Sequence, residues 1–255
     1  MDKEQAVREV GCDHTPHCGW KHFAPVSGKG LSVIVPSRDS SNFVPCAEAV
    51  RRHEPALRIV LIDDMGQMGL SWLPRPDLDP CVGFATDWLF IYARNCNKGI
   101  ELAGQDDVVL LNDDALLQTP GGFTMLQKAA EEHPEYGVIA ATTNNVGNRS
   151  QFPQGIGLRE DPRMVCFVAV LIPRRTIDAV GLLDERFVGY GCDDDDYCLR
   201  VRKAGLKIGI HDGCFVDHKS LHSTFRGDAR NGGNYLSNLE IFKRKWGRDN
   251  WGNKA

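Results

Sequence analysis

The sequence predicts an α/β fold in which helices cover both faces of a largely parallel β-sheet. Strand-like and helix-like segments alternate from residue 31 onward, and this order is typical of sheets built from β-α-β units. Three strand-like segments also end abruptly in polar residues, at 37–39, 63–64 and 112–114. If these strands are parallel, their polar ends meet at one edge of the sheet, where open α/β folds bind ligands.

The composition is that of a globular protein. A chain of 255 residues with 42% hydrophobic and 25% charged residues can bury a core without metal or disulfide staples. Its net charge of −4 offers no basic field for a polyanion. No apolar run is long enough to span a bilayer, and the N-terminus lacks the apolar core of a signal peptide. Nine scattered cysteines fit reduced thiols, so we expect a cytoplasmic protein.

Residues 1–30 form an N-terminal extension ahead of the main domain, which we place at residues 31–255. The extension holds five residues of the types that ligate zinc: Cys12, His14, His17, Cys18 and His22. Their spacing matches no standard zinc finger or ribbon. Two interpretations stay open, a structural zinc site and a loosely docked extension without metal.

The first half of the main domain supplies three strands and two helices. We expect strands at residues 32–35, 58–62 and 108–111, and helices at residues 43–53 and 93–103. The strands are short apolar runs, and the helices carry apolar residues at helical spacing. Pro36 should end the first strand, and Gly104 lies where the second helix should end.

The third strand turns polar at Asn112, Asp113 and Asp114. Two carboxylates at the end of a rigid strand suit a hard divalent cation, which leaves its other positions to water and substrate phosphate. The alternative is that these acids only cap a turn or the next helix. Neither a G-x-G-x-x-G motif nor a Walker loop follows the first strand. A bound phosphate would therefore be met by a metal rather than by a glycine loop.

The second half predicts further elements and an acidic cluster. Thr119 and Pro120 should be the N-cap and first residue of a helix, and residues 137–140 and 164–172 should be strands. A short helix at 175–180 should end at Gly181. Four aspartates at 193–196 open another helix. The helix dipole favours acids there by roughly 0.3–1 kcal/mol each. However, four adjacent acids also repel one another, which raises the pKa of some of them, and a carboxylate with a raised pKa is a candidate general base.

Several short motifs together resemble the family 2 glycosyltransferases, in order and in spacing. They lie at 97–100, 109–114, 181–187, 193–200 and 204–205, with supporting stretches at 33–38, 63–64 and 242–247. The resemblance covers residues 31–247. It implies the GT-A fold, a Rossmann-like three-layer α/β/α arrangement with a mostly parallel mixed sheet, and inversion at the anomeric carbon. It also implies a nucleotide-binding half at 31–115, and an acceptor half with the C-terminal helix at 116–255.

The resemblance assigns roles to residues that face the donor. The motif of the first strand lies along the nucleotide and consists of Pro36, Ser37 and Arg38. Asp63 matches the acid that contacts the base, usually uracil. Arg94 and Asn97 either face the nucleotide or serve packing and capping.

Metal binding and catalysis are implied in the same way. Asp113 would lie near the ribose, while Asp114 and His218 would hold Mn²⁺ or Mg²⁺. Asn112 departs from the family's D-x-D pattern and leaves the ion one charge fewer. Asp194 matches the catalytic base.

The implied activity is metal-dependent, inverting hexosyl transfer from a nucleoside diphosphate sugar, usually a UDP-sugar, to an acceptor hydroxyl. The cation would neutralise the leaving diphosphate, and the aspartate would accept the proton of the attacking hydroxyl. The polar stretch at 142–157 should border the acceptor through side chains at Asn144, Asn145, Asn148 and Arg149.

Three alternatives stay open. The acceptor could be a hydroxymethylated pyrimidine in viral DNA, which the basic residues Lys243, Arg244, Lys245 and Arg248 favour slightly unless they only solvate a helix face. The protein could be a nucleotidyltransferase, although such enzymes more often carry a glycine-rich basic loop after the first strand. It could also be a non-catalytic module that binds a nucleotide sugar. The sugar, the acceptor and the oligomeric state do not follow from the sequence.

Overall fold

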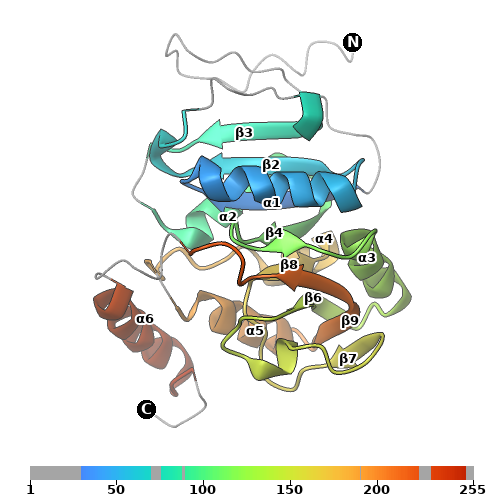
Figure 1. The fold of residues 1–255 in the computed structure, drawn as a ribbon. Coiled ribbons are helices and arrows are strands. Elements are labelled where there is room, and N and C mark those ends of the chain that lie inside the picture. Colours follow the sequence, from blue (N-terminus) through green and yellow to red (C-terminus); the bar gives the residue numbers. More distant parts are fainter. Residues whose placement is uncertain (1–29, 70–75, 88–89, 190, 224–230, 251–255) are drawn as a thin grey trace, which may run out of the picture.

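A computed structural model describes residues 30–69, 76–87, 90–189, 191–223 and 231–250. Its strands are β1 (Leu31–Ser37), β2 (Arg58–Asp63), β3 (Cys81–Ala85), β4 (Asp107–Leu111), β5 (Leu116–Leu117), β6 (Tyr136–Thr143), β7 (Leu158–Glu160), β8 (Ala169–Ile172) and β9 (Lys207–Asp217). They form one nine-stranded sheet in the order β3-β2-β1-β4-β8-β6-β9-β5, with β7 paired to β9 (Figure 1). Strands β1 to β4 are parallel, and so are β6 and β9. Strand β8 runs against both β4 and β6, so the mostly parallel mixed sheet is confirmed.

Helices cover both faces of the sheet, which confirms the three-layer prediction. They are α1 (Ser40–His53), α2 (Tyr92–Ala103), α3 (Gly122–Glu132), α4 (Arg174–Val180), α5 (Asp193–Lys203) and α6 (Asn231–Trp246), with 3₁₀ turns at Asp64–Gly66, Pro76–Leu78 and Arg149–Gln151. Helices α1 and α3 pack on one face, and α2, α4 and α5 pack on the other. Helix α6 packs on α5 and the loop before it, where Phe187, Cys192 and Phe242 form a small separate core.

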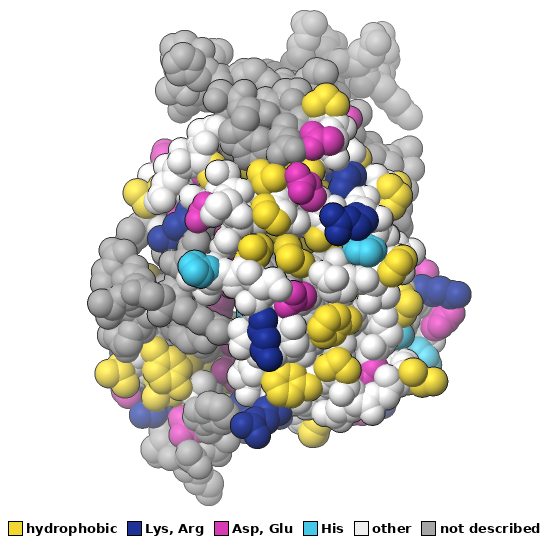
Figure 2. All heavy atoms as spheres, in the orientation of Figure 1, with side chains coloured by type: hydrophobic (Ala, Val, Ile, Leu, Met, Phe, Trp, Pro, Cys, Tyr) yellow, Lys and Arg dark blue, Asp and Glu magenta, His cyan; other side chains and the backbone are white. Residues whose placement is uncertain are grey.

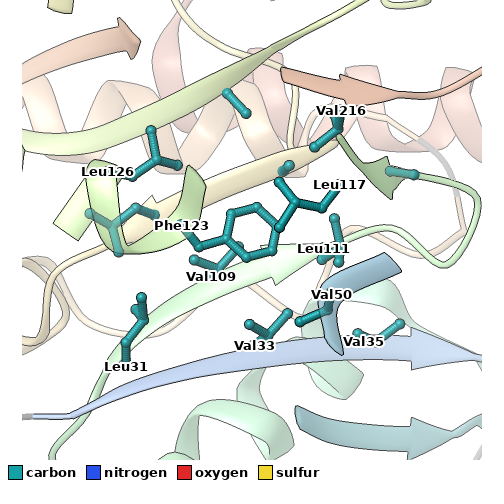
Figure 3. Packing of buried hydrophobic residues seen from close by; sticks show 14 of the residues in the cluster. Leu31, Val33, Val35, Val50, Val109, Leu111, Leu117, Phe123, Leu126 and Val216 are labelled. Atoms are coloured by element: carbon teal, nitrogen blue, oxygen red, sulfur yellow. The ribbon is translucent and has the colours of Figure 1, made fainter. Parts of the chain in front are cut away.

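The apolar strands supply both layers of the core, because alternate side chains point to opposite faces. In β4, Val109 and Leu111 belong to one cluster, and Val108 and Leu110 belong to the other. Figure 3 shows Phe123 of α3 in the first cluster, among side chains from β4, β5 and α1. This buried framework fixes the end of β4, where the acids follow.

Two predicted boundaries are wrong for reasons of tertiary structure. Strand β1 continues through Pro36, which lies in register with Ile62 of β2. Its pairing with β4 stops at Ile34, so on that side no strand needs the N–H group that proline lacks. Helix α3 starts at Gly122 with Gly121 as its N-cap, because the Thr119 hydroxyl accepts a hydrogen bond from the Phe215 N–H at 3.0 Å instead.

The run at 164–172 is only partly a strand. Ala169–Ile172 forms β8, whereas the residues from Met164 to Val168 are largely buried outside regular structure. The seven cysteines within the described ranges are free thiols. No helix in those ranges combines the length and the apolar character that a membrane crossing requires. The predicted zinc ligands of the N-terminal extension lie outside the described residues.

Candidate active site

A cavity of about 380 Å³ lies between the carboxyl end of β4 and the N-terminus of α5. Asp113 and Asp114 line it from the β4 side, and Asp193 and Asp194 line it from the α5 side. The imidazole of His218, which follows β9, also borders it. The fold thus gathers acids from distant parts of the sequence around one space.

Asp113 joins the ends of two parallel strands, as predicted. The Ser37 hydroxyl at the end of β1 donates a hydrogen bond to Asp113 Oδ2 at 2.6 Å. Asp113 is almost fully buried, and burial raises the pKa of its carboxyl to about 7, although the Ser37 bond opposes this. Near neutral pH this side chain is therefore partly protonated and can donate as well as accept hydrogen bonds.

Asp114 faces His218 in a buried pair. The distance from His218 Nε2 to Asp114 Oδ1 is 2.9 Å, and both residues are about 5% exposed. His218 Nδ1 lies 2.6 Å from the backbone oxygen of Asn145. That oxygen only accepts, so Nδ1 carries a proton, and in the neutral ring Nε2 presents its lone pair beside the carboxylate. Either a second proton or a cation must then separate Nε2 from Asp114.

This donor set fits a divalent cation. A metal-bound histidine typically gives its other N–H to a backbone carbonyl, as His218 does to Asn145. One imidazole with one carboxylate suits Mn²⁺ better than Mg²⁺, which prefers oxygen ligands only. Within the described residues, no third His, Cys, Asp or Glu completes a closed metal cluster. The pair thus leaves several coordination positions to water and substrate.

Two of the three asparagines expected at the acceptor, Asn144 and Asn145, position His218. Asn144 Oδ1 accepts a hydrogen bond from the His218 N–H at 2.9 Å, and Asn144 Nδ2 donates to Asp217 at 2.8 Å. Asn145 Nδ2 donates to the His218 carbonyl at 2.9 Å. Asn148 lines the cavity, but its amide donates to Asp161 and to the Met164 carbonyl.

The acidic run at 193–196 divides into two pairs. Asp193 and Asp194 are half-buried at the cavity wall, and no side chain among the described residues donates a hydrogen bond to either. Burial raises the pKa of Asp193 to about 6. Burial, followed by the charges of Asp195 and Asp193, raises the pKa of Asp194 well above its usual range. These effects raise the pKa of both carboxylates more than the helix dipole lowers it, so the carboxylates in the cavity are basic.

The second pair connects α5 to the C-terminal region. Asp196 is fully buried and accepts hydrogen bonds from Arg200 Nε at 3.0 Å, Lys245 Nζ at 2.7 Å and Trp246 Nε1 at 2.8 Å. Asp195 accepts one from Asn250 Nδ2 at 3.1 Å. The sequence does not reveal this division, because all four acids look alike there.

The other predicted donor residues lie in different surroundings. Pro36 lines the cavity. Arg38 is not among the lining residues; its Nε lies 3.4 Å from Asp64 Oδ2. Asp63 is also buried outside the lining, and its carboxylate accepts a hydrogen bond from the Met68 N–H at 3.1 Å.

The predicted pair on α2 contacts the loop that follows α4. Arg94 Nε lies 3.0 Å from Glu185 Oε2, and Arg94 is not among the residues that line the cavity. The Asn97 amide accepts from the Leu183 N–H and donates to the Leu183 carbonyl, both at 2.9 Å. Of the two interpretations for Asn97, these contacts favour packing and capping.

Sequence reasoning missed several lining residues. They are Phe90, Tyr92, Arg163, Phe167, Tyr235 and Asn250. They come from α2, the loops and α6, and no local spacing connects them with the acids. Only tertiary packing brings them to the cavity.

Comparison with known proteins supports the fold. No family model matches the chain, and no curated protein matches its sequence. Among solved structures, the crystal structure of GalNAc-T7 with UDP, GalNAc and Mn²⁺ is similar over 84% of this chain, with a TM-score of 0.62 and 13% identity. The chain spans 48% of that protein's length, about half. This likeness shows a GT-A-like α/β fold.

Proposed function

We propose that the protein is a metal-dependent, inverting glycosyltransferase of the family 2 type, which transfers a sugar from a nucleoside diphosphate sugar to a hydroxyl. One observation carries the proposal: a single cavity has a pair of residues suited to a divalent cation, Asp114 and His218, on one side and the carboxylate of Asp194, with its raised pKa, on the other. The GalNAc-T7 structure, which shares the fold, contains UDP, GalNAc and Mn²⁺. This favours a UDP-sugar as the donor.

The β4 side of the cavity would bind the donor. Asp114 and His218 would hold the cation, which supplies positive charge to the leaving diphosphate. Asp113, fixed by Ser37, would bind the ribose hydroxyls. Pro36 lines the same wall. We keep Arg38, Asp63 and Arg94 as proposed nucleotide contacts, outside the lining of this cavity.

The α5 side would bind the acceptor. Asp194 would accept the proton of the acceptor hydroxyl while its oxygen forms a bond to the anomeric carbon. The bond from that carbon to the diphosphate oxygen breaks on the opposite face, so one displacement inverts the configuration. The raised pKa of Asp194 suits this role, because a carboxylate with a higher pKa is a stronger base.

A donor screen tests the proposal. The full chain would be incubated with UDP-, GDP- and dTDP-sugars, with and without Mn²⁺, and melting temperature and nucleotide release would be followed. We expect UDP-sugars to stabilise the protein only with Mn²⁺ and to release UDP. Binding without release, even with acceptors, would favour a non-catalytic module. Pyrophosphate release from a nucleoside triphosphate would favour a nucleotidyltransferase.

The basic residues near the C-terminus give a nucleic-acid acceptor little support. Lys245 Nζ lies 2.7 Å from both Asp184 and Asp196, and Lys243 Nζ lies 3.2 Å from Glu240. On the face in Figure 2, Lys and Arg side chains lie scattered among acidic, apolar and polar groups. A carbohydrate or another small hydroxyl compound is therefore the proposed acceptor.

A further inference from the structure

A second cavity, of about 270 Å³, adjoins the candidate active site. Four residues, Arg163, Met164, Asp195 and Asn250, line both cavities. The two cavities therefore adjoin at these side chains.

The two cavities carry opposite charge. The smaller one is lined by three arginines, Arg163, Arg202 and Arg248, and by one acid, Asp195. The larger one is lined by five aspartates and by Arg163 as its only Lys or Arg within the described chain. The whole chain has a net charge of −4, so a cluster of arginines beside the acidic site is a local exception. A lining of like charges favours a ligand of the opposite sign.

Neutral groups hold Arg202, and the three arginines outnumber the one acid in the lining of the smaller cavity. Arg202 donates hydrogen bonds to two backbone oxygens, from Nε to Arg163 at 3.2 Å and from Nη2 to Asp161 at 2.6 Å. Arg248 makes no hydrogen bond to a described residue, and neither Arg202 nor Arg248 lies within ion-pair distance of a described carboxylate. Asp195, the one acid of the lining, accepts a hydrogen bond from Asn250 and also interacts with the charges of Arg163 and Arg248, so one carboxylate faces three guanidinium groups. Guanidinium groups so placed bind carboxylate or phosphate oxygens in pairs.

We propose that the smaller cavity is the anion-binding part of the acceptor site, and that the acceptor carries a carboxylate or a phosphate beside its reactive hydroxyl. The inference rests on the proposed function. The hydroxyl would lie in the larger cavity near Asp194, and the anionic group would lie among the three arginines. The substrate class is then an acidic or phosphorylated sugar rather than a neutral one.

The test measures binding of three matched sugars to the full chain with Mn²⁺ and UDP. The probes are glucuronate, glucose 6-phosphate and glucose, and calorimetry gives their affinities. We expect at least one anionic sugar to bind about ten-fold more tightly than glucose, and the stronger of the two distinguishes carboxylate from phosphate. Arg248→Gln should remove that preference, and Arg248→Lys should restore part of it. Arg244→Gln is the matched control on α6 and should keep the preference.

Two results would overturn the inference. One is equal affinity for all three sugars in the unmodified protein that binds UDP. The other is an unchanged preference in Arg248→Gln and also in Arg163→Gln, at an exposed position. Failure of the unmodified protein to bind UDP with Mn²⁺ would instead contradict the proposed function itself.

Discussion

The two acidic walls of the cavity differ in how their carboxylates are held. On the β4 wall, Asp113 accepts a hydrogen bond from Ser37, and Asp114 lies against His218. Ser37 is the last residue of β1, and His218 directly follows β9. On the α5 wall, Asp193 and Asp194 lack such side-chain partners among the described residues, while their pKa values are raised. The carboxylates of the β4 wall are therefore fixed by partners, whereas those of the α5 wall have raised pKa values and are basic.

This difference matches two different chemical tasks. A metal site needs ligands in a constant geometry, which contacts between rigid elements provide. A general base needs a free lone pair and a pKa close to the working pH. Placing unpaired carboxylates at the α5 wall costs stability, so the rest of that wall must be held by other bonds. Asp196, with its three donors, supplies them.

The largest expected effect comes from removing the proposed base. Asp194→Asn keeps the shape of the side chain and the oxygen that accepts a hydrogen bond from the Asp195 N–H. The amide of asparagine, however, cannot take up a proton near neutral pH. We expect sugar transfer to fall by about 10²–10⁴-fold, while UDP binding with Mn²⁺ is retained. Asp193→Asn is the matched control in the same wall and should lose far less. Equal losses in both variants would show that the two acids share the role.

The next effect concerns the bonds that hold the α5 wall. Asp196→Ala removes the buried carboxylate that pairs with Arg200 and Lys245. Because their charges then lose this partner, we expect a loss of about 3–5 kcal/mol in the free energy of unfolding. Lys245→Met should cost less, because Arg200 and Trp246 still donate to Asp196. Urea denaturation of both variants measures the difference. A loss below about 1 kcal/mol in Asp196→Ala would mean that solvent screens this cluster as it screens surface pairs.

A smaller effect is expected when the fixed wall loses a ligand. His218→Ala should weaken Mn²⁺-dependent UDP binding by roughly 10–100-fold, which calorimetry with and without Mn²⁺ measures. His222→Ala is the matched control, because His222 is close in sequence but exposed. If both variants bind UDP equally well with Mn²⁺, His218 only packs against Asp114.

Local sequence patterns predicted most of the fold and part of the β4 wall. Apolar runs and helical spacing placed β1, β2, β4, α1, α2 and α5 correctly, because those residues are buried by the faces that the patterns describe. The errors at Pro36 and Thr119 arose where a neighbouring strand decides which hydrogen bonds are needed. Parallel strand order also predicted that Ser37 and Asp113 converge.

The remainder of the site could not be predicted, because it depends on contacts without a local signal. Four consecutive aspartates do not indicate that the first three line the cavity, that Asp195 also binds Asn250, or that Asp196 binds Lys245. The arginines of the second cavity lie at 163, 202 and 248, in a loop, in α5 and after α6. Only the packing of α6 on α5 brings them together.

The smallest expected effect concerns the contribution of the α5 wall to stability as pH changes. The folded state raises the pKa of Asp193 to about 6, so it binds this proton more tightly than the unfolded chain does. Stability contributed by this group is therefore lost as pH rises from about 4 to about 6. Asp193→Asn removes the loss, and its melting temperature at pH 7 should exceed that of the unmodified protein by about 2–4 °C. The gain should disappear near pH 4, where the carboxyl is protonated in the folded state.

Asp184→Asn is the opposite control: its bond with Arg186 lowers the pKa of Asp184, so that variant should lose stability at pH 7. A lower melting temperature at pH 7 in Asp193→Asn as well would mean that the ionised carboxylate of Asp193 stabilises α5.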